Sequence, residues 1–432
     1  MEIYSKNDTY ILYQGNMLDM LDDIEENSID CIITDPPYEL NFMNKGWDNA
    51  GVSFQKETWE KCLKVLKPGG YLLSFSGSRT SHRITCAIED AGFEIRDTIM
   101  WLYGSGFPKS MNVGLAIDKK LGVESKTIGV NQNILIKQKK DLETGHRKIV
   151  DSYNSGAEDR NNGFKNTSAD IKEPVSDIGK QFKGYGTSLK PSYEPIIIAR
   201  KPFKGSLVDN IMKYGVGGLN IDECRIEHNE ELKTTNRNPK NSEVFNVDNC
   251  GFDNTKNHIA SANPDGRFPA NTILTYDETD FEEVCGGFPY TKSTGGSGEK
   301  SISGGLSGKV YQGGWLHDKV CSHLGGLGDS GSASRYFYCA KASKRDRNDG
   351  CENINNHPTV KPTSLMQYLV RLVAPKGSVI LDPFNGSGST GKAVLYENKD
   401  RQADYKYIGI DLSEEYLEIS KQRLDYVLNN DV

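Results

Sequence analysis

The sequence predicts an α/β fold in which one parallel sheet is interrupted by long insertions. At both ends of the chain, short apolar runs typical of buried strands alternate with segments of helical periodicity, the pattern of a parallel sheet covered by helices. Between these ends the chain is polar and rich in Asn, Ser and Gly. Each end alone has too few strands for a stable sheet, so we expect both to form one domain.

The first half of this domain is expected in residues 1–110. In chain order the pattern predicts a strand, a helix, a strand, a helix and a strand, at 28–35, 53–70, 71–78, 81–93 and 94–105. Both helices have stop signals, because Pro-Gly-Gly ends the first pattern and Gly92 ends the second.

The second half is expected in residues 356–432. Residues 364–397 read as a helix, a strand, a Gly-rich turn and a helix, and 405–424 read as a strand and a helix. Ser413 predicts the start of the last helix, since it can act as N-cap and two Glu residues follow in the first turn.

The middle of the chain divides into three segments. Residues 111–190 form a polar insertion, and 191–227 return to the core with the strand-like "PSYEPIIIARKP" (191–202). Residues 228–355 are again loop-like, with a Gly-rich passage and no repeat of fixed period. We therefore expect two insertions in one sheet.

Composition limits the function classes. No run of about 18 apolar residues predicts a transmembrane helix, and the start of the chain lacks the pattern of a signal peptide. Nine cysteines without a CxxC pair indicate reduced thiols in a cytoplasmic protein, and "HDKVCSH" (317–323) lacks zinc spacing, so we predict no metal site. The net charge of −7 neither indicates nor excludes a nucleic-acid partner.

A carboxylate, two prolines and a tyrosine directly follow the first buried strand, in "ITDPPYEL" (33–40). Asp and Pro are common turn formers, so an ordinary turn is one interpretation. The other is a small rigid site, because each proline fixes φ and removes an N–H group.

A Gly-rich turn follows a second strand end, in "VILDPFNGSGSTGKAV" (379–394). Asp382 ends the strand, and the glycines allow close backbone approach at a helix N-terminus. The spacing is not that of a P-loop. Asp411 ends the next strand, where an acid in nucleotide-binding α/β folds holds ribose hydroxyls; an acid that only favours the following helix is the alternative.

Together these motifs resemble one family, the S-adenosylmethionine-dependent DNA amino-methyltransferases. The resemblance rests on "DPPY" (35–38), "NHPTVKP" (356–362), "DPFNGSGST" (382–390) and "IGID" (408–411). With DPPY first and the cofactor turn last, the order resembles the beta group, whose target-recognition region lies in the gap, here 228–355. The resemblance implies a Rossmann-like class I methyltransferase sheet that is circularly permuted.

The resemblance also implies a reaction. A methyl group would pass from S-adenosylmethionine to an exocyclic amino nitrogen of a base flipped out of DNA. Asp35 and the Pro36 carbonyl would accept the amino hydrogens, Pro37 would stiffen the turn, and Tyr38 would stack on the base. The Asp favours adenine N6 over cytosine N4, which remains the alternative. Motif order and the leading Asp disfavour RNA or protein glutamine as substrate, and the intact motifs disfavour a non-catalytic DNA-binding module.

Cofactor contacts are implied at four places. The turn would line the methionine part, and Asp411 would take the ribose, while "HPTVKP" would close over the methionine carboxylate and "YQGNMLDML" (13–21) would lie beside the adenine. The residues so nominated are Asp382, Pro383, Phe384, Asn385, Gly386, Ser387, Gly388, Asp411, Thr359, Lys361, Asn16 and Met17. For Met17, a place in the core is an equal alternative.

Double-stranded DNA is the implied partner; a cognate restriction endonuclease and a homodimer are left open. Basic residues beside aromatics suit phosphate contact and base stacking. This pattern occurs in "SRYFYCAKASKRDR" (334–347), and the loop "GSGFPKS" (104–110) would flank the target base. The DNA-binding candidates are Lys109, Tyr336, Lys341, Lys344, Arg345 and Arg347. An edge strand that runs into a charged helix is the alternative for 334–347.

Overall fold

The computed structural model is divided into two units by its internal contacts. Unit 1 comprises Met1–Leu40, Trp47–Gly104 and Tyr193–Val432, and unit 2 comprises Asn41–Gly46 and Ser105–Ser192. The structure describes residues 2–40, 51–103, 110–132, 135–136, 169–226, 235–236, 259–260, 265–276, 290–292, 330–332, 337–341, 346–351 and 355–430.

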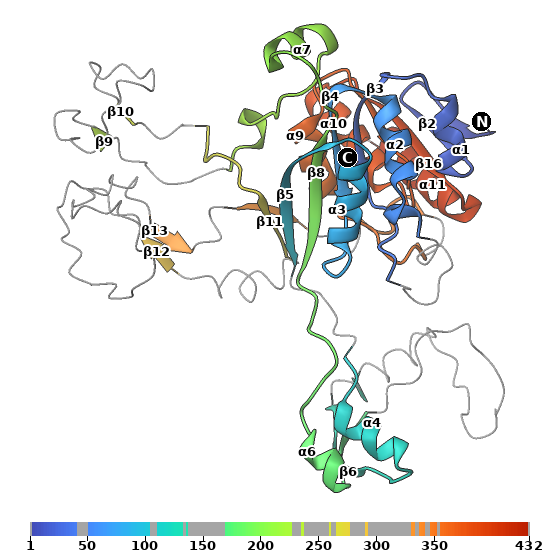
Figure 1. The fold of residues 1–432 in the computed structure, drawn as a ribbon, viewed down its shortest axis with the longest axis vertical. Helices are drawn as coiled ribbons and strands as arrows, with labels where there is room; N and C mark the ends of the chain where they lie inside the picture. Colours follow the sequence, from blue (N-terminus) through green and yellow to red (C-terminus); the bar gives the residue numbers. More distant parts are fainter. Residues whose placement is uncertain are drawn as a thin grey trace. The chain divides into compact units, whose positions relative to one another are not determined.

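Unit 1 is built on one large sheet (Figure 1). In spatial order its described strands are β1 (Glu2–Lys6), β2 (Tyr10–Gln14), β16 (Lys406–Asp411), β15 (Val379–Asp382), β3 (Ile29–Thr34), β4 (Leu66–Phe75), β8 (Tyr193–Arg200), β5 (Glu94–Tyr103), β11 (Thr272–Tyr276) and β14 (Tyr338–Lys341). From β2 to β4 all neighbours are parallel. The ends of the chain thus form one sheet, as predicted.

The sheet is not wholly parallel, however. β8 runs antiparallel to both of its neighbours, β4 and β5, and β1 runs antiparallel to β2. β5, β11 and β14 are again parallel to one another. The amino end of β8 therefore lies at the same edge of the sheet as the carboxyl ends of β3, β4 and β5.

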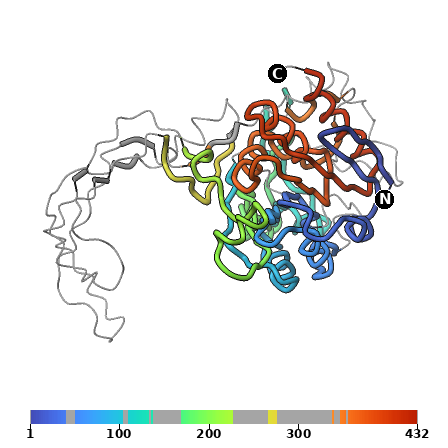
Figure 2. The backbone as a smooth tube through the Cα atoms, turned by 90° about the horizontal axis from the view of Figure 1, so that it is seen from above, coloured from blue at the N-terminus to red at the C-terminus, as the bar shows by residue number. Residues whose placement is uncertain are grey.

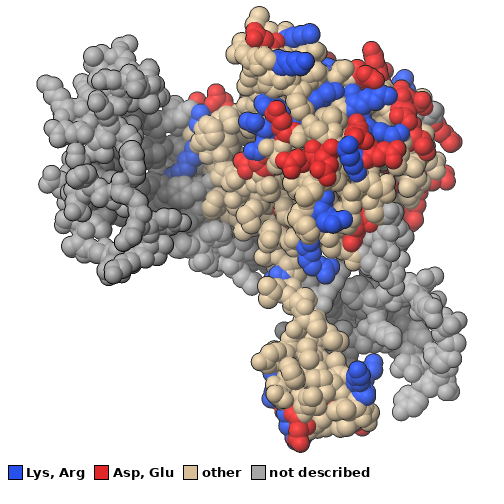
Figure 3. All heavy atoms as spheres, in the orientation of Figure 1, with Lys and Arg blue, Asp and Glu red and all other residues tan. Residues whose placement is uncertain are grey.

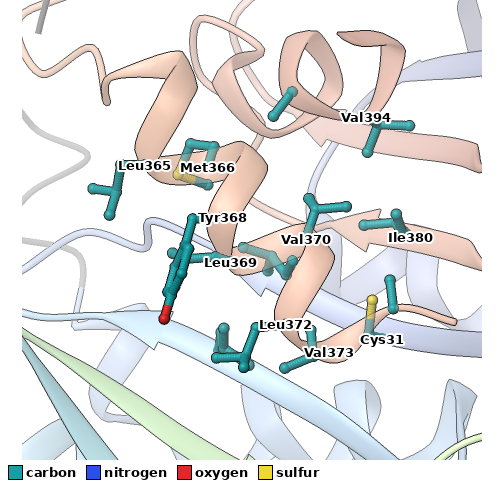
Figure 4. Close-up of a cluster of buried hydrophobic side chains, with 14 of the residues drawn as sticks. Cys31, Leu365, Met366, Tyr368, Leu369, Val370, Leu372, Val373, Ile380 and Val394 are labelled. Atoms are coloured by element: carbon teal, nitrogen blue, oxygen red, sulfur yellow. The ribbon is translucent and has the colours of Figure 1, made fainter. Parts of the chain in front are cut away.

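Helices cover both faces of this sheet (Figure 2). The described helices of unit 1 are α1 (Met17–Met20), η1 (Leu21–Asp23), η4 (Val52–Phe54), α2 (Lys56–Val65), α3 (Ser81–Asp90), α7 (Leu207–Tyr214), η5 (Asp222–Cys224), α9 (Thr363–Val373), α10 (Ser389–Arg401) and α11 (Glu414–Asn429). Helices α9, α10 and α11 pack on one face, where α9 buries a row of apolar side chains (Figure 4). Helices α2 and α3 pack on the other face.

Strand periodicity explains the two cores. In β3, Cys31 and Ile33 join the cluster under α9, whereas Ile32 joins the cluster under α2 and α3. In β8, Ile196 joins the cluster under α9 and Ile197 joins the cluster under α2 and α3. Alternate residues of a strand point to opposite faces, so a strand buried on both sides is apolar throughout.

Two local predictions differ from the structure. The predicted helix over 53–70 ends at Val65, and its Pro-Gly-Gly stop signal lies within β4. There the Asn210 side chain of α7 donates to the Pro68 carbonyl at 3.0 Å, and a Cβ on Gly69 would lie 2.2 Å from that amide nitrogen. The glycine is therefore needed for close packing within a strand.

Several short strands fall inside the insertions. β11 and β14 come from the 228–355 segment and extend the main sheet, while β9 (Thr235–Asn236) pairs with β10 (Ile259–Ala260) and β12 (Tyr290–Lys292) pairs with β13 (Ser330–Ser332). The described part of unit 2 contains α4 (Val113–Lys120), α6 (Asp177–Gln181) and the antiparallel pair β6 (Lys126–Val130) and β7 (Asp170–Glu173). Among the described helices, none combines the length and apolar character that crossing a membrane requires.

A buried carboxylate ties α10 to α9, and its removal should destabilise the fold. Glu397 is fully buried and accepts hydrogen bonds from Arg371 at 2.6 Å and from Arg401 at 3.1 Å. We expect Glu397→Ala to lower the free energy of unfolding by about 3 kcal/mol, because both guanidinium groups lose their shared partner. Chemical denaturation measures this. Glu60→Ala, which removes an exposed pair with Lys56, should cost less than about 1 kcal/mol; equal losses would contradict the account.

Candidate active site

Three acidic side chains gather at the carboxyl edge of the parallel strands. Asp411 is the last residue of β16, Asp382 is the last residue of β15, and Asp35 follows β3 directly. These strands are adjacent in the sheet, in the order β16, β15, β3. Ligands of open α/β sheets bind outside the carboxyl ends of the strands, so this edge is the candidate active site.

Asp35 forms a buried ion pair with Lys361. The Lys361 ammonium nitrogen lies 2.5 Å from Asp35 Oδ2 and 3.5 Å from Glu194 Oε2. The Lys361 side chain is 7% exposed, whereas the two carboxylate side chains are 21% and 20% exposed. One ammonium is therefore shared by two carboxylates at the mouth of the site.

Aromatic side chains surround this ion cluster. The Tyr38 hydroxyl donates to Glu194 Oε2 at 2.8 Å, and the Tyr103 hydroxyl donates to Glu194 Oε1 at 3.2 Å. The Lys361 nitrogen lies 5.0 Å from the ring centroid of Phe75 and 5.4 Å from that of Tyr38. These rings shield the charges from water and attract the cation.

The surroundings shift the pKa values of Asp35, Lys361 and Tyr38. Burial raises the pKa of the Asp35 carboxyl; Lys361 opposes this rise and Glu194 adds to it. Burial alone would lower the pKa of Lys361, but the carboxylates of Asp35 and Glu194 outweigh it, so the pKa of Lys361 is raised. Burial also raises the pKa of Tyr38. Lys361 thus stays charged at neutral pH.

The two prolines leave a backbone acceptor beside Asp35. Pro36 is buried and has no N–H group. Within the described part of the chain its carbonyl accepts no hydrogen bond. On the far side of the turn, the Tyr38 ring packs close to Gly77, where a Cβ would lie 3.1 Å from Tyr38 Cδ2. The DPPY turn therefore presents a carboxylate, a carbonyl and a fixed ring.

Asp382 is buried beneath the Gly-rich turn and held by hydroxyl groups. Thr34 Oγ1 donates to its Oδ1 at 2.7 Å, and Thr390 Oγ1 donates to its Oδ2 at 2.8 Å. The Phe384 N–H donates to Oδ1 at 3.1 Å. Thr34 immediately precedes Asp35, so the strand that carries Asp35 also touches the acid of the turn.

The burial of Asp382 predicts a measurable pH effect. Burial raises its pKa from 3.8 to about 7, against the opposing hydrogen bonds. Between pH 4 and 7 the unfolded chain ionises at this residue while the folded protein keeps the proton, so stability falls as pH rises and levels off above 7. Asp382→Asn should abolish this pH-dependent loss of stability, which amounts to at most about 4 kcal/mol.

Denaturation at a series of pH values checks this effect. Asparagine preserves the shape of the side chain, and the threonine hydroxyls can reorient to serve its amide. Asp90→Asn, at the exposed end of α3, is the matched control and should leave the slope unchanged. A slope that Asp382→Asn does not alter would contradict the assigned titration.

The Gly-rich turn is fastened from two sides. Asp411 Oδ2 accepts the Gly386 N–H at 2.7 Å, and Asp411 Oδ1 accepts the Ser413 N–H at 2.9 Å. The fully buried Arg423 of α11 donates to the Ser387 carbonyl at 2.6 Å. Gly386 and Gly388 have φ of 50° and 71°, a left-handed conformation that glycine adopts readily.

Asn385, also nominated for the cofactor, lies on the inner side of the turn. Its Oδ1 accepts the Tyr407 hydroxyl at 2.8 Å, and its backbone N–H donates to the Ile410 carbonyl at 2.9 Å. The side chain is 4% exposed. Asn385 therefore supports the turn from the sheet; Pro383 lies within the turn between Asp382 and Phe384.

The segment that carries Lys361 closes over the turn through a histidine. His357 Nδ1 accepts the Thr359 N–H at 3.4 Å, and a Cβ on Gly386 would lie 2.9 Å from His357 Nε2. Burial lowers the pKa of His357 to about 3, and the cations Lys361, Arg423 and Arg347 add to this effect. The imidazole is therefore neutral and packs on the turn.

Asn16 and Met17, nominated beside the cofactor adenine, follow a backbone contact with Asp411 at the same edge of the sheet. The Gly15 N–H donates to the Asp411 carbonyl at 3.0 Å, and exposed Asn16 caps α1 through the Leu18 N–H at 3.1 Å. Met17 is 4% exposed and belongs to the core under α2. The core alternative thus describes the Met17 side chain.

Comparison with known proteins identifies the family of this chain. A family model described as DNA methylase matches residues 29–422, most of the 432-residue chain. The chain belongs to this family. The type II methyltransferase M.HpaI of Haemophilus parainfluenzae is 37% identical over 103 residues, which is 22% of this chain and 32% of that protein.

A second relative matches a shorter stretch, and a solved structure matches at low identity. The DNA adenine methyltransferase YhdJ of Escherichia coli (strain K12) is 34% identical over 74 residues, 17% of this chain and 23% of that protein. Both alignments thus span less than a third of the relative. The M1.HpyAVI–SAM complex is 14% identical with a TM-score of 0.35, covering 96% of this chain and 99% of that chain.

The donors and acceptors at this edge fit S-adenosylmethionine, the cofactor that membership of a methylase family supports. Each Asp411 oxygen has accepted one N–H and keeps a lone pair for a ribose hydroxyl. Asp382 is buried at the base of the turn, and α10 begins at Ser389 directly after the turn. The nominated Lys361 instead has its ammonium between Asp35 and Glu194. When bound, the cofactor would supply an electrophilic methyl group.

Most of the DNA-binding candidates lie outside the described residues. These are Lys109, Tyr336, Lys344 and Arg345. Lys341 ends the edge strand β14. Arg347 donates to the His357 carbonyl at 2.6 Å and so fastens the 355–362 segment. Figure 3 shows acidic and basic side chains interspersed on one face of unit 1, so that face offers no field of a single sign.

Sequence reasoning missed several residues of this site. The largest omission is Glu194, which contacts Lys361, Tyr38 and Tyr103. Its signal was an acid directly before an apolar run, in "EPIIIA" (194–199). The supporting residues Thr390 and His357 stand in the quoted motifs but were not nominated, and Thr34 and Arg423 were missed because only the fold brings them to the turn.

Proposed function

We propose that the chain is a DNA methyltransferase that transfers a methyl group from S-adenosylmethionine to the exocyclic N6 of an adenine flipped out of double-stranded DNA. The observation that carries the proposal is the junction of two motifs at adjacent residues. Thr34 donates to Asp382 under the cofactor turn at 2.7 Å, and the next residue, Asp35, opens the DPPY turn. The methyl donor and the amino group that receives the methyl would therefore meet at the end of β3.

The chemistry requires acceptors rather than a metal or covalent nucleophile. The lone pair of an exocyclic amino group is delocalised into the base, so the nitrogen is a poor nucleophile. Asp35 and the Pro36 carbonyl would accept its two hydrogens and favour a tetrahedral nitrogen whose lone pair faces the methyl group. Placement of this kind lowers the barrier through orientation and electrostatics. The raised pKa of Asp35 suits it to accept the proton that the nitrogen then loses.

Tyr38 would stack on the flipped base. Its hydroxyl is held by Glu194 at 2.8 Å and its ring packs close to Gly77. A ring held at both places gives the base a fixed platform, which offsets part of the cost of unstacking it. The 228–355 segment, with Lys341 at the end of β14, would recognise the DNA sequence.

Adenine is preferred to cytosine on two grounds. The DPPY turn begins with Asp, and one relative is a DNA adenine methyltransferase. Cytosine N4 remains the second candidate, because the matching family is described only as DNA methylase and both amino groups present the same two hydrogens.

Partition of a label tests the proposal. The protein is incubated with methyl-labelled S-adenosylmethionine and unmethylated genomic DNA, in parallel with RNA and with a protein extract. We expect label in DNA alone, at adenines within one short sequence that single-molecule sequencing identifies. Label confined to RNA or protein would contradict the proposed substrate.

A further inference from the structure

We propose that Glu194 is a positioning residue that takes over the Lys361 ammonium when Asp35 accepts the target amino group. The inference rests on the proposed function, since it concerns the same acceptor. Lys361 is 2.5 Å from Asp35 and 3.5 Å from Glu194, so a short movement of the ammonium exchanges its nearer partner.

The exchange keeps the buried Lys361 ammonium paired with a carboxylate. A buried ammonium whose carboxylate partner turns to another ligand would remain unpaired, which is costly in an apolar site. The Lys361 side chain is 7% exposed and therefore gains little from water. With Glu194 in place, Asp35 can turn one oxygen to the base while the ammonium keeps a full counter-charge.

Glu194 is held in place by two tyrosine hydroxyls. Its carboxylate accepts the hydroxyls of Tyr38 at 2.8 Å and Tyr103 at 3.2 Å. Its strand is fixed to β4, because the Ser76 N–H and hydroxyl both donate to the Pro195 carbonyl at 3.0 Å. The same contacts fix Tyr38, so one carboxylate would place both the stacking ring and the ammonium.

The lysine, in contrast, lies among aromatic faces. Its nitrogen is 5.0 Å from the ring centroid of Phe75 and 5.9 Å from that of Trp101. The Trp101 indole N–H donates to Thr275 Oγ1 at 2.8 Å, which fixes that ring. Aromatic faces attract a cation without a directional hydrogen bond, so they accommodate the ammonium in both positions.

Kinetics of Glu194→Gln test the inference in the full-length protein. The amide keeps the shape but not the charge, so we expect kcat/KM for DNA to fall roughly tenfold to hundredfold, with cofactor affinity little changed. The groups around Asp35 are Lys361, Glu194, Tyr38 and Asp382, and Glu194 raises the pKa of Asp35. Its loss should therefore move the acid limb of the pH–rate profile to lower pH, which a merely structural change would not do.

The matched control is Glu94→Gln, at the other end of the same pair of strands. Glu94 pairs with Arg200 at 2.7 Å, and its substitution should leave both the rate and the acid limb unchanged. If the wild-type protein methylates DNA and Glu194→Gln matches it in both, the inference is overturned.

A second measurement needs no activity. Thermal unfolding is compared for Asp35→Asn, Glu194→Gln and the double variant. Each single variant leaves Lys361 one carboxylate, so we expect small decreases in Tm, whereas the double variant should lose more than their sum. Additive decreases would overturn the inference whether or not the protein methylates DNA. Failure of the wild-type protein to methylate DNA, with coupled decreases in Tm, would instead contradict the proposed function alone.

Discussion

Asp35→Asn should reduce methyl transfer by at least about 10³-fold while cofactor binding persists. The amide cannot take up a proton from the amino group, and its NH₂ would face a donor where an acceptor is required. The fold should survive, because Lys361 keeps Glu194 as a partner at 3.5 Å. Single-turnover methylation of DNA measures the rate, and calorimetry measures the affinity for S-adenosylmethionine.

Asp22→Asn is the matched control for this variant. Asp22, in η1, forms an exposed ion pair with Lys61 of α2 at 2.6 Å. Its substitution should leave both the rate and the affinity unchanged. If Asp35→Asn retained a rate within tenfold of the wild-type protein, Asp35 would not be the acceptor.

Gly388→Ala should weaken cofactor binding by at least about tenfold, because it combines a clash with backbone strain. The new Cβ would lie 2.2 Å from Ser420 Oγ and 3.0 Å from Ser420 Cβ, and Gly388 has a φ of +71°. The turn and α11 would have to separate, which would disturb the Arg423 contact with Ser387. Calorimetry with S-adenosylmethionine measures the loss.

Two further variants separate the clash from the strain. Gly377 has a similar φ of +82°, but a Cβ added there would meet no atom within 4 Å. Gly377→Ala should therefore cost about 1 kcal/mol of stability and leave cofactor affinity unchanged. Adding Ser420→Gly to Gly388→Ala removes the clash and should restore part of the affinity. Equal losses of affinity at Gly377 and Gly388 would contradict a specific role for the turn.

The sequence predicted the parallel strands β3, β4, β15 and β16, but not β2, because these four contain apolar runs that are largely buried. Runs such as "IDCIIT" (29–34) are buried throughout and mostly apolar, and glycine and N-cap signals separate them from helices. The site residues of this part followed directly, since Asp35, Asp382 and Asp411 each stand at a strand end. Parallel strands bring their carboxyl ends to one edge, which made the juxtaposition predictable.

The direction of a strand, however, leaves no trace in its sequence. The run at 191–202 predicted a strand, and β8 occupies Tyr193–Arg200, but it runs antiparallel to its neighbours. For a parallel strand, Glu194 would lie at the far edge of the sheet. Its role in the site therefore depends on a pairing that periodicity does not encode.

The edge strand β11 was missed for another reason, and β14 was expected only as the edge-strand alternative for 334–347. Each has at most five residues and lies in the 228–355 segment, among glycine-rich passages. Runs this short do not establish a period, and their partners lie far away in the sequence. β11 pairs with β5 and β14 pairs with β11, so tertiary contacts rather than local pattern define them.

In the proposed reaction, the DPPY turn presents the amino group of a DNA base to a methyl donor. The most direct test is the mass of the nucleosides released from DNA after reaction with the wild-type protein and with Asp35→Asn. We predict N6-methyldeoxyadenosine with the wild-type protein and none with the variant. Two results would contradict this role of the DPPY turn. One is unmodified nucleosides after reaction with wild-type protein that binds S-adenosylmethionine. The other is equal methylation by Asp35→Asn and the wild-type protein.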